Sequence, residues 1–236
     1  MHASSQPVPT FPARTASSTR ICGPAVHSFT PSGRVTDIAA PQAGAVDFAE
    51  VASRLARIAR FTGAGQDMGR GMAFSVAQHS VMGAQALMAD GENRHTATLF
   101  LLHDAHEYVT GDITSPVSAL LAETMESMAK GGGMLYQAAL ARIKAGWDAA
   151  IYAAAGLPAP DAWPPRIARI VKQMDARMLA AEAEALFGTA ARRTMPASKF
   201  PVPRTRGAIE PWGAMKAEEE FAGMLQRLTL PARCAA

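Results

Sequence analysis

The residues with the clearest chemical potential lie in the segment His103-Asp104-Ala105-His106-Glu107, which directly follows the apolar run 99–102. Ionisable side chains at the end of an apolar helix are costly to bury unless they are paired or bound to a metal. If the segment is helical, His103 and Glu107 share a face, and Asp104 lies about 100° round from His103. One imidazole and two carboxylates then converge, which favours a catalytic or metal-binding site.

Two further donors lie in other segments whose neighbours are mostly apolar. His79 stands among apolar and small residues, and Asp175 lies four residues from Val171 and three from Met178, on the face expected to be buried. A buried carboxylate needs a compensating cation, and no basic residue shares that face. Two imidazoles and two carboxylates suit manganese, cobalt, iron, zinc or nickel, and suit magnesium less well. We predict one divalent transition metal, with a second left open, and the ligands His79, His103, Asp104 and Asp175.

Rival hydrolytic sites are excluded by the spacing of the residues. His106-Glu107 is not followed by the second His of a zinc-protease HExxH motif, because position 110 is Thr. The sequence also contains neither the Gly-x-Ser-x-Gly turn of serine hydrolases nor a P-loop. We assign no ligand role to His106 and place it beside the site or at the surface.

Helices must hold these residues, because apolar side chains recur at three- and four-residue spacing from Asp47 onward and no run alternates as a strand does. Asp47 and Ser75 are predicted N-caps, and Ser115-Pro116 is a typical helix start. The predicted helices span residues 47–60, 75–90, 93–109, 115–130, 166–187 and 212–228, with a further helix around 140–151. Glycine- or proline-rich loops separate them, at 61–72, 131–133, 157–165 and 188–211. The predicted fold class is all-α, a single helical bundle.

Composition and charge narrow the possible settings and partners. About half of the 236 residues are apolar, enough for one sizeable core. The net charge of +3 comes from basic residues in the first thirty-odd positions and in 192–206, so a stable nucleic-acid complex is not expected. Cys22 and Cys234 lie near the ends, which excludes a disulfide framework and favours a reducing, cytoplasmic setting. No run of eighteen apolar residues suits a transmembrane helix.

The two ends of the chain are predicted to lie outside the folded domain. The first 36 residues contain no Asp or Glu, as in an organelle transit peptide, but their prolines break the amphipathic helix such a peptide needs. We predict a disordered or loosely attached extension over 1–35, one domain over 36–230 and a tail over 231–236.

Four segments occur in a recognisable order: Phe74-Ser-Val-Ala-Gln-His79-Ser80, Leu102-His103-Asp104-Ala105-His106-Glu107, Thr110-Gly111-Asp112 and Met174-Asp175. Together they resemble the H…HD…D signature of HD-domain phosphohydrolases. More narrowly, they are similar to the bacterial 5′-deoxynucleotidases and to the phage and prophage HD phosphohydrolases that act on deoxynucleotides. The resemblance covers about residues 30–228, because 30–34 and Ile58-Ala-Arg60-Phe61 are also similar to that group.

The resemblance implies roles for residues around the four predicted ligands. Glu107 and Asp112 are implied to act on the attacking water or the leaving group, Arg60 to contact the phosphate and Phe61 to lie against the sugar. The implied activity is metal-dependent cleavage of the 5′ phosphoester of a nucleotide, by a 5′-deoxynucleotidase. The alternatives are a deoxynucleoside triphosphate hydrolase that releases triphosphate and a non-catalytic nucleotide-binding module. By analogy with that group we also expect a homodimer.

Overall fold

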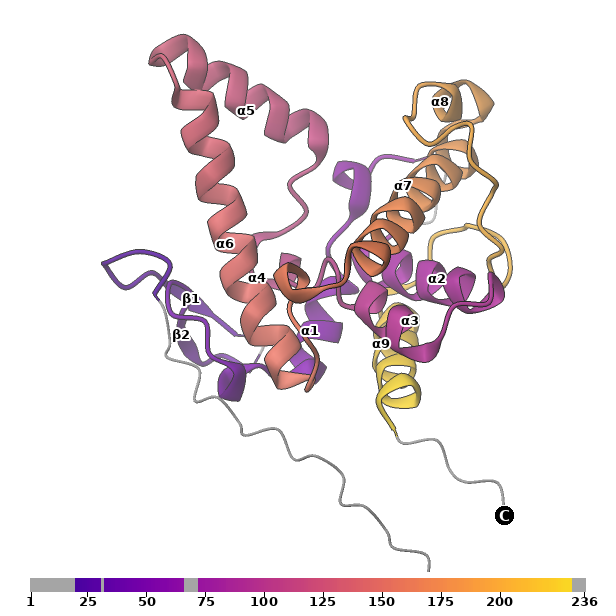
Figure 1. Ribbon diagram of the computed structural model, residues 1–236, viewed down its shortest axis with the longest axis horizontal. Coiled ribbons are helices and arrows are strands. Elements are labelled where there is room, and N and C mark those ends of the chain that lie inside the picture. The colour runs from indigo at the N-terminus through magenta and orange to yellow at the C-terminus, as the bar shows by residue number, and fades with distance from the viewer. Residues whose placement is uncertain (1–19, 31, 66–71, 231–236) are drawn as a thin grey trace, which may run out of the picture.

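The computed structural model describes residues 20–30, 32–65 and 72–230. Within these ranges the protein is a helical bundle with one short antiparallel sheet, which confirms the all-α class (Figure 1). The strands are β1 (His27–Phe29) and β2 (Val35–Asp37), and the helices are α1 (Phe48–Leu55), α2 (Val76–Ala89), α3 (Arg94–Leu101), α4 (Glu107–Thr110), α5 (Ser115–Met128), α6 (Gly132–Ala154), α7 (Pro165–Phe187), α8 (Thr189–Arg193) and α9 (Ala214–Thr229). No described helix is both long and apolar enough to cross a membrane.

Helix α2 lies at the centre of the bundle and packs against α3, α7 and α9. Almost all of its residues are buried because its side chains are apolar or small on nearly every side. It begins where expected, at Ser75, whose hydroxyl accepts a hydrogen bond from the Gln78 backbone N–H at 3.2 Å. Asp47 caps α1 in the same way, through the Ala49 N–H at 2.9 Å. Both predicted caps are confirmed.

Helices α5 and α6 form an antiparallel hairpin that projects from the rest of the bundle (Figure 1). Helix α5 buries none of its residues, whereas the C-terminal half of α6 enters the core through Trp147, Ile151 and Tyr152. The Tyr152 hydroxyl donates to the Leu99 carbonyl at 2.7 Å. This contact fixes the end of α6 beside the end of α3.

The helix expected over 93–109 is wrong in one important respect, because α3 ends at Leu101. The next residues form tight turns, in which the His103 N–H donates to the Phe100 carbonyl at 3.1 Å and the Ala105 N–H to the Leu102 carbonyl at 3.0 Å. A separate short helix, α4, starts at Glu107. His103 and Glu107 therefore do not share one helical face.

The N-terminal segment also departs from expectation, as far as it is described. Residues 1–19 of the extension predicted over 1–35, and the predicted tail 231–236, lie outside the described residues. The rest of the extension contains β1 and leads into β2, and Arg20 pairs with Asp37 at 2.9 Å. The Ile21 N–H donates to the Ala39 carbonyl at 2.8 Å. Residues 20–30 and 32–35 thus belong to the folded domain.

Two smaller differences from the predicted helices concern the end of α1 and the segment after α7. Helix α1 ends at Leu55, short of residue 60, and the chain then pairs with the start of α2: the Arg60 N–H donates to the Phe74 carbonyl at 2.8 Å. The loop predicted over 188–211 contains the short helix α8.

Gly83 allows α2 and α3 to approach closely, and this gives a prediction for stability. A Cβ at position 83 would overlap ring atoms of the fully buried Phe100. We expect Gly83→Ala to lower the free energy of unfolding by about 1–2 kcal/mol, and the melting temperature by several degrees, because overpacking costs up to about 3 kcal/mol and the gain in helix propensity offsets only about 1 kcal/mol of it. The control is Gly44→Ala, where nothing lies within 4 Å of the added Cβ. Equal melting temperatures for the two variants, measured by circular dichroism, would contradict this expectation.

Candidate metal centre

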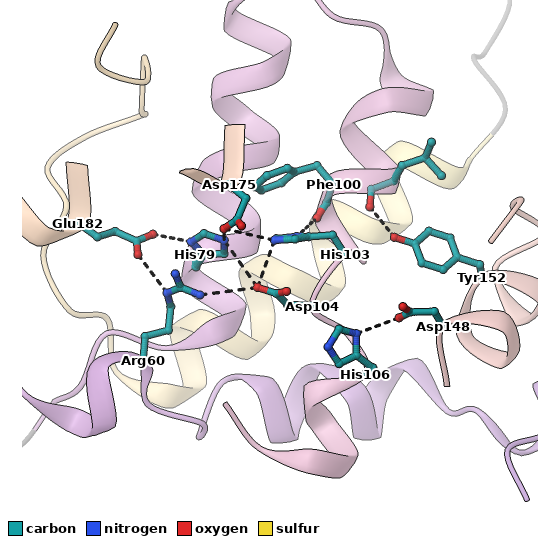
Figure 2. A network of polar contacts seen from close by, with 11 residues as sticks. Arg60, His79, Phe100, His103, Asp104, His106, Asp148, Tyr152, Asp175 and Glu182 are labelled. Carbon is teal, nitrogen blue, oxygen red and sulfur yellow. Dashed lines mark hydrogen bonds and ion pairs between the residues drawn. The ribbon is translucent and has the colours of Figure 1, made fainter. Parts of the chain in front are cut away.

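The structure brings the four predicted ligands together from three separate segments. His79 comes from α2, Asp175 from α7, and His103 and Asp104 from the turns after α3 (Figure 2). One nitrogen or oxygen atom of each lies within 4.8 Å of all the others. The prediction that these side chains converge is confirmed, and the group can hold a metal ion.

The spacing within the group fits a single small cation. The His79 Nε2 atom lies 3.3 Å from Asp175 Oδ1 and 3.9 Å from Asp104 Oδ2. The His103 Nε2 atom lies 3.2 Å from Asp104 Oδ2 and 3.7 Å from Asp175 Oδ1. Ligands placed about 2.1 Å from one ion at tetrahedral angles are about 3.4 Å apart. Both Nε2 atoms are buried and make no hydrogen bond among the described residues. They are therefore available to bind a metal ion.

Hydrogen bonds at the opposite ring nitrogens set the orientation of both imidazoles. The His103 Nδ1 atom lies 2.6 Å from the Phe100 carbonyl oxygen, which can only accept, so Nδ1 carries the proton. The His79 Nδ1 atom likewise donates to Glu182 Oε1 at 2.6 Å. Each ring in its neutral form therefore directs the Nε2 lone pair toward the carboxylates, as metal-ligating imidazoles do.

The ionisation of the cluster follows from its mixture of charges. Burial lowers the pKa of His103, but the nearby carboxylates of Asp104 and Asp175 outweigh this, and the pKa is well above its usual range. For His79, burial and the charge of Arg60 lower the pKa. Glu182 and Asp175 outweigh these two effects, so the pKa of His79 is raised overall. Burial raises the pKa of Asp104, yet the positive charge of His103 beside it holds that pKa well below its usual range. The carboxylate is therefore ionised.

Arg60 is held beside the ligands by the pairing between the end of α1 and the start of α2. Its Nε donates to Glu182 Oε2 at 3.0 Å, and its Nη1 lies 3.6 Å from Asp104 Oδ2. The two following residues, Phe61 and Thr62, have left-handed backbone conformations, with φ of 53° and 54°. Such backbone strain is concentrated at functional sites. The Arg60 guanidinium lies 5.8 Å from the Phe61 ring centre, so the two predicted substrate-binding residues are neighbours.

The two predicted acidic residues adjoin the cluster without belonging to it. Glu107 is 5% exposed, and burial, with the negative charges of Asp104 and Asp112, raises its pKa to about 9. Asp112 is half-buried after Gly111, whose φ of 73° and ψ of 169° are accessible only to glycine. Burial raises the pKa of Asp112 against the opposing charge of Arg60.

Three residues near the site were not predicted from the sequence. Glu182 lies seven residues after Asp175, two turns along the same face of α7, and that spacing is a usable signal. Asp148 of α6 accepts from His106 Nδ1 at 2.9 Å, and Lys144 lies one turn earlier on the same helix. Nothing in the sequence links α6 to the site, because the contact depends on how the hairpin docks.

Glu182 connects a ligand to the predicted phosphate-binding residue. It is fully buried, and the charges of Arg60 and His79 overcome the effect of burial, so that its pKa is lowered and it is ionised. Its two oxygens accept from two donors, His79 Nδ1 and Arg60 Nε.

Replacing Glu182 with glutamine is expected to weaken metal binding by about 10- to 100-fold. The amide offers a single acceptor oxygen, so it cannot satisfy both His79 and Arg60. Calorimetric titration of metal-free protein with Mn²⁺ measures this effect, and Glu184→Gln, a more exposed position on the same helix, is the control. An unchanged affinity for Mn²⁺ in Glu182→Gln would show that Glu182 does not position His79.

Comparisons with known proteins leave the activity open. No protein-family model matches the chain. An uncharacterized protein of Rhodobacter capsulatus is 38% identical over 96 residues, which make up 39% of this chain and 46% of the relative. The match therefore spans less than half of the length of this relative, whose name assigns no activity.

Proposed function

We propose that the protein is a metal-dependent phosphohydrolase of the HD type that cleaves the 5′ phosphoester of deoxynucleotides, as a 5′-deoxynucleotidase does. The observation that supports this most is the convergence of His79, His103, Asp104 and Asp175, with two buried Nε2 atoms that have no hydrogen-bond partner. The order of these residues along the chain is also that of the HD signature. The proposed setting is the cytoplasm, and the proposed assembly is a homodimer.

The cluster has the donors and the access that hydrolysis of a phosphoester needs. A divalent cation held by such ligands lowers the pKa of a water molecule and polarises a phosphoryl oxygen. The Asp175 side chain is 43% exposed, so the cluster is open on the α7 side. A phosphate group can approach the ligands from there.

Arg60 is suited to bind that phosphate group. Glu182 and Asp104 orient its Nε and Nη1 atoms, while its Nη2 atom has no partner among the described residues. A guanidinium fixed in this way donates to phosphoryl oxygens and offsets the charge that grows on them during cleavage. Phe61 would then lie against the sugar attached to the phosphate.

Glu107 is suited to move the proton. Its carboxyl group is buried beside Asp104, and its Oε2 atom makes no hydrogen bond. In its ionised form Glu107 takes a proton from the attacking water and passes it to the 5′ oxygen of the leaving deoxynucleoside. Asp112, beyond Gly111, is the second acidic group proposed to act on the water or the leaving group.

The test is a panel of nucleotides incubated with protein that has been stripped by a chelator and reloaded with Mn²⁺ or Co²⁺. We expect each active deoxynucleoside monophosphate to yield the deoxynucleoside and orthophosphate, and the chelated protein to yield neither. Release of triphosphate from deoxynucleoside triphosphates would assign the substrate to the alternative class instead. Nucleotide binding without metal-dependent release of any phosphate product would overturn the proposal.

A further inference from the structure

A cavity of about 510 Å³ lies where the C-terminal parts of α2 and α9 meet the start of α3. These three helices pack against one another (Figure 1). None of the candidate metal ligands lines the cavity, and Gln85, which does, follows His79 by six residues, about 9 Å along the axis of α2. The cavity is therefore separate from the candidate metal centre, and its volume is typical of sites for small molecules.

The wall of this cavity combines positive charge with apolar side chains. Its charged residues are Arg94, Arg206 and Arg227, its large apolar ones are Met88, Met224 and Leu228, and no acidic side chain lines it in the described part of the chain. We propose that the cavity binds a small organic phosphate. The arginines bind the phosphate group, the apolar side chains pack against the body of the ligand, and Gln85 accepts a hydrogen bond from a hydroxyl or amino group on that body. The inference goes beyond the proposed function, because it concerns a separate site.

The three guanidinium groups keep donors for an anion. Arg206 makes no ion pair or hydrogen bond among the described residues. The Nη2 atom of Arg94 donates to the carbonyls of Arg227 and Leu230 at the end of α9, so its Nε and Nη1 atoms remain. Arg227 lies 3.9 Å from the Glu220 carboxylate, but both side chains are exposed and such a pair is weak. Arginines with donors left over are suited to bind phosphate oxygens.

The nearest carboxylates in the sequence do not neutralise the cavity. Asp90, directly after the last lining residue of α2, pairs with Arg177 at 2.7 Å and with Arg204 at 3.1 Å. Glu92 pairs with Arg166 at 3.0 Å. Because other arginines engage both carboxylates, the three guanidinium groups around the cavity attract an anion from solution.

Gln85 indicates that the ligand is more than an inorganic anion. Its Oε1 atom is buried and makes no hydrogen bond among the described residues. A buried acceptor needs a donor, and a fully ionised phosphate group offers none. A hydroxyl group of a sugar or an amino group of a base supplies one, and the same body then covers the apolar side chains.

The test is a ³¹P nuclear magnetic resonance titration of the full-length protein, with a chelator present so that no metal ion takes part. The probes are glucose 6-phosphate, AMP and inorganic phosphate. We expect saturable binding of an organic phosphate, tighter than that of inorganic phosphate, and the tighter of the two organic probes identifies the body as a sugar or a nucleoside. Absence of saturable binding, or one common affinity for all three probes, would overturn the inference.

Variants locate the bound molecule. Arg206→Gln is expected to weaken binding of the organic phosphate by at least about 10-fold, whereas Arg193→Gln, at an exposed position on α8, keeps the wild-type affinity. Gln85→Met keeps the length of the side chain without its acceptor. It should weaken binding of the organic phosphate by about 2- to 10-fold and leave that of inorganic phosphate unchanged.

Two results would reject this site. Binding that Arg206→Gln does not weaken lies outside the cavity, and binding that Gln85→Met does not weaken involves no contact with Gln85. Because the titration contains no metal ion, its result is independent of hydrolysis. Failure of the proposed function would therefore leave it unchanged.

Discussion

Replacing Asp175 with asparagine is expected to reduce the affinity of the candidate metal centre for Mn²⁺ by at least about 100-fold. We also expect turnover to fall to the level of chelator-treated protein. Loss of residues that merely orient a ligand already costs about 10- to 100-fold, so loss of a ligand itself must cost more. Asp175 is the one predicted ligand on α7, and its Oδ1 atom lies within 3.7 Å of both imidazole Nε2 atoms. The neutral amide removes one charge from the set but changes the shape of the side chain very little.

The measurement pairs elemental analysis with the nucleotide assay. Asp161→Asn, at an exposed position before α7, is the control and should bind metal and turn over as the wild type does. In metal-free buffer near neutral pH the variant should melt at a lower temperature than the wild type, because, against the effect of burial, His79 and His103 hold the pKa of Asp175 well below its usual range and the amide loses that stabilisation. Metal binding is therefore measured at a temperature at which circular dichroism shows the variant to be folded. Full metal occupancy in Asp175→Asn would remove α7 from the metal centre.

Replacing Glu107 with glutamine is expected to lower turnover by about 10²- to 10⁴-fold, while the candidate metal centre keeps its affinity for Mn²⁺. That range is typical for the loss of a group that transfers a proton in the transition state. The amide retains the size of the side chain but can neither accept nor release a proton. Turnover is measured with the nucleotide panel at saturating Mn²⁺, and unchanged turnover would show that Glu107 carries no proton.

Although it lowers turnover, Glu107→Gln should raise the stability of the metal-free protein. In the folded state the pKa of Glu107 is about 9, compared with an ordinary value of 4.5. Between these values unfolding releases the proton, so this group makes the folded state less stable as pH rises through that window. Glu107→Gln should therefore unfold at higher urea concentration than the wild type at pH 8, and the difference should shrink toward pH 4.5. A variant that is less stable at both pH values would indicate a structural role.

The sequence was sufficient to predict which four side chains converge, because His79 and Asp175 interrupt apolar helical patterns and His103 and Asp104 directly follow one. His79 lies among small and apolar residues, and Asp175 lies at the edge of the buried stripe of α7, next to the buried Met174. The pattern also predicted the caps at Asp47 and Ser75, since these depend only on local hydrogen bonds. Local spacing thus predicts which side chains are buried, and burial of polar groups indicates a site.

Features that depend on contacts between distant segments could not be predicted in this way. Glu182 is surrounded by Ala180, Ala181 and Ala183, and its burial makes sense only once Arg60 and His79, from other segments, are placed against it. Helix α3 ends at Leu101 because tight turns follow it, and the spacing of apolar residues does not indicate such turns.

The short sheet escaped prediction for a different reason. Strands β1 and β2 have three residues each, too few for an alternating pattern to appear. They are held by Asp37, whose Oδ1 atom accepts from the Val26 and Ala39 N–H groups. The Asp37 side chain therefore helps to hold the two strands together, and the residues around Asp37 in the sequence do not indicate this role.

The orientation of the imidazoles has a consequence for how the protein responds to its surroundings. Hydrogen bonds to Glu182 and to the Phe100 carbonyl occupy the Nδ1 atoms of His79 and His103, so each Nε2 accepts either a proton or the cation. The raised pKa of both rings means that protons compete well, and loading therefore expels them into solution. A proton and a cation would thus compete for the same two atoms, so acid would weaken the binding of a cation there.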